Sequence, residues 1–543
     1  MKKQLSMLAI LVSASLHAQA AQDPFFKIID DEVKGYASGI SADGNGLIGI
    51  NTKNDMAEHF STVRFADFLV DRFRFEQGCM LSNSVCNSFW NDKSNFAYQW
   101  RVDFLAKTDQ RSNVGSVVSN ETDGLVTALG DVSGTRVGYK MDGKLRTAFA
   151  VVEEGNSVNL KDGASTHSLS VPTSIKKLDS GQYLVTGTAA TGKNIAVNSE
   201  TYNWCFAGND GQYGDYRYCP GLNTQASFWL LNGSDVKLLQ ANEYARARNE
   251  VVQTASALGV GKFNGNLYGV GYSSTGEIGT NYLDGRNLAA YWTLDLDNSK
   301  VGTTQIIPLA EGEPGKDDAK LQHSWAVGVN DNGYVIGNQL YRINKGQNRP
   351  VEMFVFNLNT PTTNAVVSLQ DKPLSGSGSE AAAINNHNMV VGWRDSRHQT
   401  QPVVNGTNRM QEGFLLNAAT SNNWYLNDLI CGLDDAGAKQ CAQNGYYYHI
   451  AYASGISTDG TVAATAFRYN SESDLNNRSN ATVVSVKLAP VVTDYKNNDP
   501  ANYVVANAPV NNQTGQDGGS GGGSLFWLTL LALPFTWLRR YQR

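Results

Sequence analysis

Hydrophobic and polar positions alternate in short runs along residues 21–490, and one degenerate sequence motif recurs among these runs. Small and β-branched residues lead into a turn of the Asn-Gly, Asp-Gly or Ser-Gly type, and a second alternating run leaves it. Such alternation is typical of half-buried β-strands, and these turns supply the positive φ of a tight hairpin. The pattern predicts seven β-hairpins, at residues 36–49, 126–139, 173–187, 256–271, 325–338, 381–393 and 452–465.

Further strands are expected after most hairpins. A glycine often stands four residues beyond the turn glycine, and because it has no Cβ it allows a neighbouring strand or sheet to approach closely. Gly138, Gly269 and Gly337 are examples. After a variable insertion, a small residue followed by aromatic residues predicts a third strand with one buried face, at residues 148–149, 226–229, 289–292, 353–356 and 413–414. Residues 424–429 predict a fourth strand in one repeat.

Three or four antiparallel strands, repeated about seven times, predict an all-β protein with the architecture of a β-propeller. Two packed β-sandwiches are the alternative, because hairpin signals alone do not show that a ring closes. Closure requires a strand from one end of the chain to complete the sheet begun by the other. Residues 25–29 are placed to do this beside residues 481–488.

Two stretches depart from the strand pattern. Residues 54–77 place apolar side chains at near-helical spacing, which predicts a helical insertion in the first blade. Residues 491–524 are polar and rich in Asn and Gly, which predicts a flexible stalk. The expected organisation is therefore a signal peptide at 1–20, a propeller at 21–490, the stalk at 491–524 and a membrane-seeking helix at 525–543.

Both ends of the chain have the pattern of sorting signals. Lys2-Lys3, an apolar run and a small-residue site that ends at Ala20 predict a secretory signal peptide. At the other end, a glycine-serine run is followed by the apolar residues 525–538 and a basic terminus. An ordinary membrane anchor or a Gly-rich linker is the alternative for this tail. The expected cleavage sites are Ala20 and the run containing Gly521, Gly522, Gly523 and Ser524.

The order of glycine run, apolar block and terminal arginines resembles the GlyGly-CTERM signal of Gram-negative bacteria. The resemblance implies processing by a rhombosortase-like protease together with type II secretion, after signal peptidase has acted. The implied location is a transient inner-membrane anchor, and then the cell surface or the medium. This resemblance covers only the extreme end of the chain.

The recurring motif itself resembles the HAF-type extracellular repeat, which residues 326–337 and 383–392 match best. Together with the tail, the whole chain looks like an uncharacterised family of exported bacterial proteins with a domain of unknown function. The resemblance implies a propeller-like exported protein and assigns no catalytic residue.

Composition bears on two questions, which are whether the partner is a nucleic acid and whether the cysteines form disulfides or bind a metal. The net charge of −6 argues against a nucleic-acid partner, which would require clustered Lys and Arg. The six cysteines form three pairs that are close in sequence, and an exported protein favours disulfides between them over metal sites. The expected pairs are Cys79–Cys86, Cys205–Cys219 and Cys431–Cys441.

Motifs for catalysis are weak. The histidines show no metal-binding spacing, so scattered surface or turn histidines are expected, and no cofactor is predicted. Calcium at the Asp-rich residues 209–215 is a weaker alternative, because the twelfth position of an EF-hand would be Pro220. Aromatic residues gathered near cysteines are the candidate recognition residues, either for stacking on a glycan or protein ligand or for packing beneath their own loops. They are Trp204, Tyr213, Tyr216, Tyr446, Tyr447 and Tyr448.

Two functions are compatible with these patterns. The first is an exported propeller that binds a ligand or partner through its loops. The alternative is an extracellular polysaccharide hydrolase or lyase, whose catalytic carboxylates would come from separate blades without a local motif. Carboxylates and an arginine that converge at the mouth of the central channel would favour the enzyme, and small or aromatic residues there would favour binding.

The two terminal signals predict the mature ends of the protein. Mass spectrometry of the surface-released chain should find an N-terminus near Ala21 and a C-terminus within the glycine-serine run. Surface protein that still carried residues 525–543 would contradict the predicted C-terminal cleavage.

Overall fold

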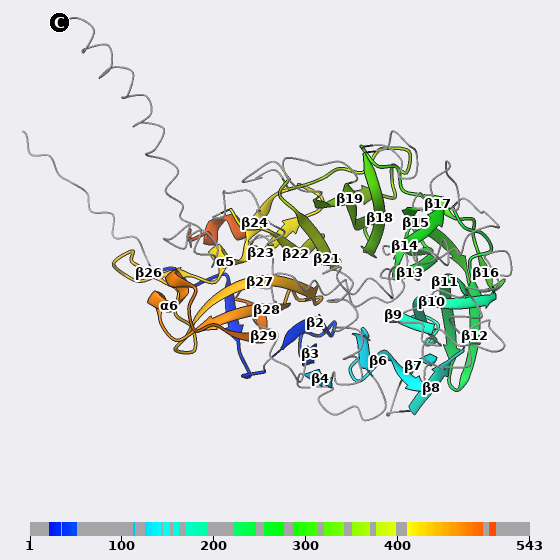
Figure 1. The fold of residues 1–543 in the computed structure, drawn as a ribbon, viewed down its shortest axis with the longest axis horizontal. Helices are drawn as coiled ribbons and strands as arrows, with labels where there is room; N and C mark the ends of the chain where they lie inside the picture. The colour runs from blue at the N-terminus through cyan, green and yellow to red at the C-terminus, as the bar shows by residue number, and fades with distance from the viewer. Residues whose placement is uncertain are drawn as a thin grey trace, which may run out of the picture.

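The computed structural model describes fifteen segments of the chain. They are residues 21–33, 35–51, 112–114, 125–142, 145–152, 156–161, 170–193, 222–245, 255–275, 286–311, 320–341, 350–369, 376–397, 410–491 and 499–506. These segments form antiparallel sheets arranged around a ring, which is the predicted β-propeller (Figure 1). Seven of the sheets in the described residues have three or more strands, and one further pair of short strands forms a ribbon.

The first four sheets follow the chain. The first contains β2 (Tyr36–Ile40), β3 (Leu47–Asn51) and β4 (Ser112–Val114). The second contains β5 (Leu125–Leu129), β6 (Arg136–Asp142), β7 (Leu145–Val152) and β8 (Asn156–Leu160). The third contains β9 (Ser170–Lys177), β10 (Tyr183–Lys193), β11 (Leu222–Asn232) and β12 (Asp235–Gln240). The fourth contains β13 (Ala255–Phe263), β14 (Asn266–Thr275), β15 (Arg286–Asp295), β16 (Lys300–Val301) and β17 (Gln305–Ile306).

The remaining sheets complete the ring. The fifth contains β18 (Leu321–Val329), β19 (Tyr334–Tyr341) and β20 (Val351–Asn357). The sixth contains β21 (Ser379–Ile384), β22 (Met389–Asp395), β23 (Gln411–Asn417) and β24 (Asn423–Tyr425). The last, called the closing sheet below, contains β27 (Tyr447–Ile456), β28 (Val462–Tyr469), β29 (Thr482–Pro490) and β1 (Phe26–Ile29).

The ring closes because β1, from the start of the described chain, pairs with β29, near its end. Phe26 lies opposite Pro490 and Ile29 opposite Lys487 in antiparallel register. The predicted partners, residues 25–29 and 481–488, are therefore confirmed. The first strands of the seven sheets, β2, β5, β9, β13, β18, β21 and β27, each contact the next first strand, and β27 contacts β2. Closure leaves each sheet packed between two neighbours.

All seven predicted hairpins form the first and second strands of the seven sheets, and each contains a β-bulge on its first strand. The pairing register shifts by one residue at the same place in every copy. The extra residues are Ser38, Thr127, Thr173, Leu258, Val327, Ala382 and Ser454. A bulge bends and twists a strand locally. The recurring motif therefore specifies one bent hairpin, repeated around the ring.

A small residue faces the bulge in each copy, for a steric reason. A Cβ on Gly392 would lie 1.9 Å from the carbonyl oxygen of Glu380, and one on Gly337 would lie 2.4 Å from that of Trp325. The predicted close approach is confirmed at Gly337 and also at Gly269, where the Phe228 ring is 2.4 Å from a Cβ position. In the fourth hairpin, however, the glycine that faces the bulge is Gly271.

Hairpin turns between first and second strands meet along one rim of the ring, called the turn rim. The Thr458 amide donates to the Ala42 carbonyl, Asn385 Nδ2 donates to the Ser457 carbonyl, and Asn330 Nδ2 donates to that of Asn385. Asp331 Oδ1 accepts from the Lys262 amide of the preceding sheet and from Lys176 Nζ one sheet further away. These bonds fasten neighbouring sheets to one another with the turn residues themselves.

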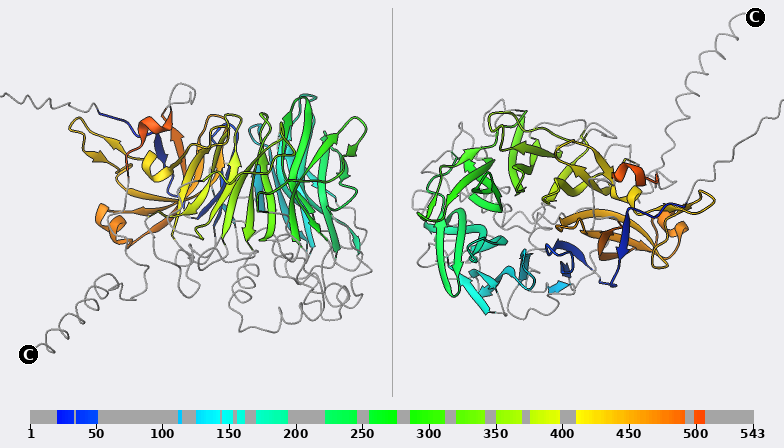
Figure 2. Two further views of the ribbon diagram at one scale, coloured as in Figure 1. Left: turned by 90° about the horizontal axis from the view of Figure 1, so that it is seen from above. Right: turned by 180° about the vertical axis from the view of Figure 1, so that it is seen from behind.

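Second strands run away from the turn rim, so their connections to third strands begin and end at the opposite rim, called the loop rim. The connection in the closing sheet contains the short helix α6 (Glu472–Asn477), which the Ser471 side chain caps by accepting from the Asp474 amide. The other connections include residues 52–111, 194–221 and 398–409. Figure 2 shows the two rims edge-on.

Some predictions are corrected or fall outside the described residues. Of the strand predicted at residues 424–429, only the part in β24 is extended, and the rest forms the short helix α5 (Leu426–Leu429), whose four residues are all buried. Within the predicted stalk, residues 499–506 contain the 3₁₀ turn η6 (Pro500–Tyr503), and Tyr503 packs edge-on against Phe25. The helical insertion at 54–77 and the tail at 507–543 lie outside the described residues. Among those described, no helix is long and apolar enough to cross a membrane.

The glycine that faces the bulge should not tolerate a side chain. G392A places a Cβ against a backbone oxygen that cannot move without breaking the hairpin, and we expect a loss of about 2 kcal/mol or more in unfolding free energy. G39A is the control, because its Cβ would meet only Ile48 side-chain atoms at 3.4 Å. Urea unfolding measures both. Equal stability of the two variants would contradict the steric argument.

Candidate functional site at the loop rim

The bulge residues of the innermost strands are uncharged and half-buried. Two of them also bond to the next sheet, since Thr127 Oγ1 donates to the Pro172 carbonyl and Thr173 Oγ1 to that of Ala257. Hydroxyl groups and small apolar side chains can make neutral contacts, but they supply neither a general acid nor a general base. At this level of the ring, the described bulge residues offer hydroxyl groups and apolar surface and carry no charge.

Charged side chains gather instead between the sixth sheet and the closing sheet, near the loop rim. We call Ser396, Arg397, Glu412, Asn427 and Asp428 the junction cluster. Arg397 follows the end of β22, Glu412 lies near the start of β23, and α5 carries the other two residues after the aromatic pair of β24. The polar side chains of the junction cluster thus come from three separate elements, which are the end of β22, the start of β23 and α5.

Arg397 and Asp428 form the central ion pair of the junction cluster. The two terminal nitrogens of Arg397 donate to the two carboxylate oxygens of Asp428, each at 2.5 Å. Burial by itself would lower the pKa of Arg397, but the bond to Asp428 and the charge of Glu412 outweigh it and raise that pKa. The guanidinium also lies 3.9 Å from the centre of the Tyr425 ring, and Arg394 lies 4.5 Å from the same ring.

Glu412 is fully buried, and donors occupy both of its oxygens. Oε2 accepts from Ser396 Oγ at 2.8 Å and from the Arg397 amide at 3.1 Å, while Oε1 accepts from Asn427 Nδ2 at 3.3 Å. Asn427 in turn spans to the closing sheet, where its side chain binds both the amide and the carbonyl of Ile450. A carboxylate held by this many donors positions the surrounding backbone.

Two histidines correct the expectation of scattered surface histidines. His449 is 3% exposed and its Nε2 lies 2.8 Å from the Gln411 carbonyl, while His323 is 2% exposed and its Nδ1 accepts from the Asn287 amide. Both lie near the loop-rim ends of first strands, where sheet-to-sheet packing covers them. Among the described residues, no three His, Cys, Asp or Glu side chains are placed to hold a metal ion.

Of the candidate recognition residues, the tyrosines that follow Cys441 are described. Tyr448 is 2% exposed and its hydroxyl donates to Asp30 Oδ2 at 2.9 Å, so of the two roles expected for these aromatic residues its ring has the packing role. Burial and the bond to Asp30 raise the pKa of Tyr448. Tyr446 packs edge-on against Tyr448 and beneath the Arg468 guanidinium, whereas Tyr447 is half-buried at the loop rim. Trp204, Tyr213, Tyr216 and the calcium candidate at 209–215 lie outside the described residues.

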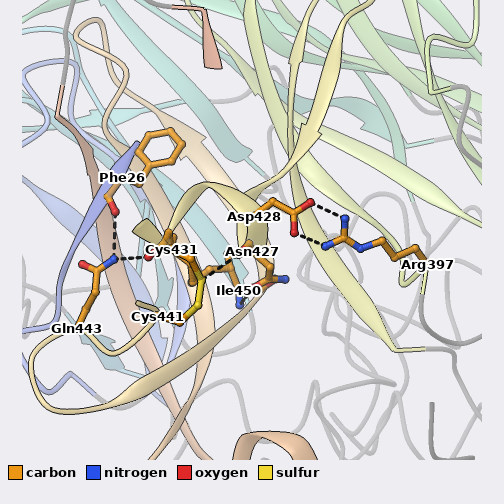
Figure 3. Close-up of a disulfide and its surroundings, with 9 residues drawn as sticks. Phe26, Arg397, Asn427, Asp428, Cys431, Cys441, Gln443 and Ile450 are labelled. Carbon is orange, nitrogen blue, oxygen red and sulfur yellow. Dashed lines mark hydrogen bonds and ion pairs between the residues drawn. A yellow bond between two sulfur atoms is a disulfide. The ribbon is translucent and has the colours of Figure 1, made fainter. Parts of the chain in front are cut away.

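One predicted disulfide is present, between Cys431 and Cys441 (Figure 3). The other four cysteines, Cys79, Cys86, Cys205 and Cys219, and the processing residues Ala20, Gly521, Gly522, Gly523 and Ser524 lie outside the described residues. The disulfide joins the end of α5 to the segment that precedes β27, and the ribbon of β25 (Gly432–Leu433) and β26 (Lys439–Gln440) lies between the two cysteines.

Sequence reasoning missed the junction cluster. Arg394-Asp395-Ser396-Arg397 is a charged run at the end of a buried strand, and this was a usable signal that a polar site begins there. Glu412 stands beside a predicted third strand, and it should have been questioned as a buried charge. No local signal pairs either residue with Asp428, because the elements meet only in the folded ring.

The ion pair of the junction cluster should contribute to stability. D428N keeps the shape of the side chain but removes the nearer of the two charged partners of Arg397, and we expect a loss of roughly 1–3 kcal/mol in unfolding free energy. E311Q is the control, since the Lys320–Glu311 pair is exposed and should contribute less than about 1 kcal/mol. Urea unfolding of both variants, with R397M for a double-mutant cycle, measures the coupling. No coupling between Arg397 and Asp428 would overturn the assignment.

Solved structures similar to this chain include propellers and carbohydrate-active enzymes. The β-propeller domain of the Trilobed protease from Pyrococcus furiosus matches at a TM-score of 0.31 and 10% identity, over 64% of this chain and 79% of that one. The polysaccharide lyase Uly1 matches at 0.33 and 10%, over 70% and 83%. A mutant of the Cellvibrio cellulosa α-L-arabinanase matches at 0.26 and 11%, over 59% and 96%. Likeness at this level carries no inference about activity.

No curated protein matches the sequence. The profile of one protein family matches residues 194–541, which is more than half of the chain and begins directly after β10. The matched region contains the junction cluster, the disulfide and all of the closing sheet except β1. The chain therefore belongs to the family described as "Protein of unknown function (DUF3466)".

Proposed function

We propose that this protein is an exported β-propeller that binds a ligand or partner through its loop rim. The observation that carries the proposal is the closed ring, which makes the connections between second and third strands begin and end at one rim. The connection 194–221, with the candidate recognition residues Trp204, Tyr213 and Tyr216, joins β10 to β11 at that rim. Tyr447 starts β27 at the same rim. Aromatic side chains there would suit stacking on a glycan or contact with a protein.

The junction cluster supports binding over catalysis. A general acid must release a proton to substrate, and a base must offer a free lone pair within about 3 Å of it. Asp428 and Glu412 already accept from Arg397, Ser396 and Asn427, and both carboxylates are nearly inaccessible. The cluster therefore fixes the ends of the loop-rim connections. The rival, an extracellular polysaccharide hydrolase or lyase, would need carboxylates other than these.

The proposed location is outside the cytoplasm. Support comes from the two terminal signals and from the Cys431–Cys441 disulfide, which persists in an oxidising compartment. Signal peptidase, a rhombosortase-like protease and the type II secretion machinery are the proposed processing partners. No cofactor and no nucleic-acid partner enters the proposal.

Binding at the loop rim should depend on its aromatic residues. The purified mature protein is screened on a glycan array and on immobilised cell-surface proteins, and the ligand found is titrated against W204A and Y447A. We expect a roughly 2- to 13-fold loss of affinity, because one stacked ring contributes about 0.5–1.5 kcal/mol. Y334A is the matched control, since Tyr334 is also half-buried but lies on the turn rim.

Polysaccharide degradation is assayed in parallel by reducing ends and by the absorbance of unsaturated products. Catalytic turnover of a polysaccharide would favour the rival enzyme. Loss of binding in Y334A, but not in W204A or Y447A, would place the ligand on the wrong rim for this proposal.

A further inference from the structure

β1 holds the ring closed, yet it is only four residues long. One of its edges pairs with β29, and among the described residues no strand of the sheet flanks its other edge. Exposed strand edges leave backbone donors and acceptors without partners. Side chains rather than a strand occupy this edge of β1, and they come from the segment that follows Cys441.

Gln443 contacts β1 at two points. Its Oε1 accepts from the Ile28 amide at 2.8 Å, and its Nε2 donates to the Ile430 carbonyl at 2.8 Å. Its Nε2 also donates to the Phe26 carbonyl at 3.1 Å (Figure 3). Asn444 Nδ2 donates to the Ile28 carbonyl at 2.9 Å. Two side chains thus make the backbone bonds that a neighbouring strand would otherwise make.

The disulfide connects Gln443 to a fixed point of the ring. Cys441 stands two residues before Gln443, and Cys431 directly follows α5 and its C-cap residue Ile430. α5 is immobilised by the Asn427 bonds to Ile450 and by the ion pair of Asp428 with Arg397. The disulfide therefore fixes Gln443 and Asn444, which bind β1, relative to the junction cluster.

The same loop also holds the chain before β1. Gln22 and Leu433 exchange both backbone hydrogen bonds, at 2.9 and 2.8 Å, and Gln22 Nε2 donates to the Asn502 carbonyl. A Cβ on Gly432 would lie 2.4 Å from the Gln22 carbonyl oxygen, so the loop and the N-terminal segment are in close contact. Residues 22–28 therefore form hydrogen bonds with the segment between α5 and β27 at both ends of this stretch.

We propose that the Cys431–Cys441 disulfide is a redox-dependent latch that seats β1, so that the ring closes fully only under oxidising conditions. With both cysteines reduced, residues 432–446 are attached to α5 only through the chain and the hydrogen bond from Gln443 to the Ile430 carbonyl, and Gln443 is held less firmly. β1 then keeps β29 as its partner but lacks the bonds on its other edge. The N-terminal segment opens locally while the other six sheets keep their packing.

The oxidation balances as a thiol–disulfide exchange. The thiolate of one cysteine attacks a small-molecule disulfide and releases one thiolate of that donor. The thiolate of the second cysteine then attacks the mixed disulfide, which forms the Cys431–Cys441 bond and releases the second donor thiolate. The two cysteines are oxidised and the donor is reduced to two thiolates. The two cysteine protons pass through solvent to these thiolates, which become thiols, so no proton is released overall. Cys431 is fully buried in the closed ring, so exchange requires the open state.

Hydrogen–deuterium exchange of the mature protein, prepared with oxidised glutathione, tests the latch. In C431S/C441S, we expect amides in the peptide covering residues 22–30 to exchange at least tenfold faster than in the wild type. Amides of β13 and β14, on the far side of the ring, should keep their rates. C205S/C219S removes a predicted disulfide elsewhere and is the control, with unchanged exchange at 22–30.

Q443A separates the latch from a general loss of stability, because it keeps the disulfide and removes only the side chain that grips β1. We expect faster exchange at 22–30 in this variant too. Unchanged exchange at 22–30 in Q443A, or in a folded C431S/C441S variant, would overturn the proposal. If C431S/C441S does not fold, Q443A decides alone. Faster exchange spread evenly over all sheets would also overturn it, since a latch acts locally.

Discussion

The pairing of β1 with β29 is the contact on which the other features of this ring depend. It joins segments more than 450 residues apart and removes the free edge that the closing sheet would otherwise have. The chain between β1 and β2 also runs beside β29, since the Ser485 amide of β29 donates to the Val33 carbonyl. With this sheet complete, β27 can contact β2, and each first strand lies between two others. The division into a turn rim and a loop rim follows from that arrangement.

Closing a long loop has an entropic cost that the other sheets do not bear, because each of them is built from one continuous stretch of chain. The interactions that stabilise the closing sheet can offset this additional entropic cost. The junction cluster, α5, the disulfide and η6 all lie at or beside it, and they combine buried hydrogen bonds, an ion pair and a covalent bond. Elsewhere neighbouring sheets are joined by apolar packing, by hydrogen bonds from turn and strand side chains such as Asn338, and by ion pairs such as Lys176–Asp331 that are more exposed.

Charged side chains are distributed unevenly over the ring, because adjacent sheets approach closely around the innermost strands. Around the innermost strands, hydroxyl groups and small side chains let adjacent sheets approach closely, as where a Cβ on Gly259 would lie 3.3 Å from Gly328. Buried carboxylates occur instead near the loop-rim ends of the strands, as at Glu380, Asp395 and Glu412. Glu352, for example, accepts from the Tyr341 hydroxyl, and burial together with this carboxylate raises the pKa of Tyr341 so that the hydroxyl keeps its proton. These charges stabilise the frame that carries the loops.

The sequence by itself determined the repeated unit. Alternation, turn glycines and the small-then-aromatic runs predicted all seven hairpins and the third strands, because these depend on local backbone geometry and on which face is buried. The bulk alternation of residues 25–29 was also enough to identify the closing strand, and the short spacing of Cys431 and Cys441 to identify a disulfide.

Only the tertiary structure decided which polar side chains meet. Arg397, Glu412 and Asp428 come from three elements whose relative positions depend on two sheets packing together, and no spacing in the sequence encodes that distance. Tyr448 and Tyr447 are adjacent aromatic residues with the same local signal, yet one is core and the other half-exposed, because successive residues of a strand face opposite sides. Gln443 has no sequence signal of its own, since its role exists only once β1 lies beside it.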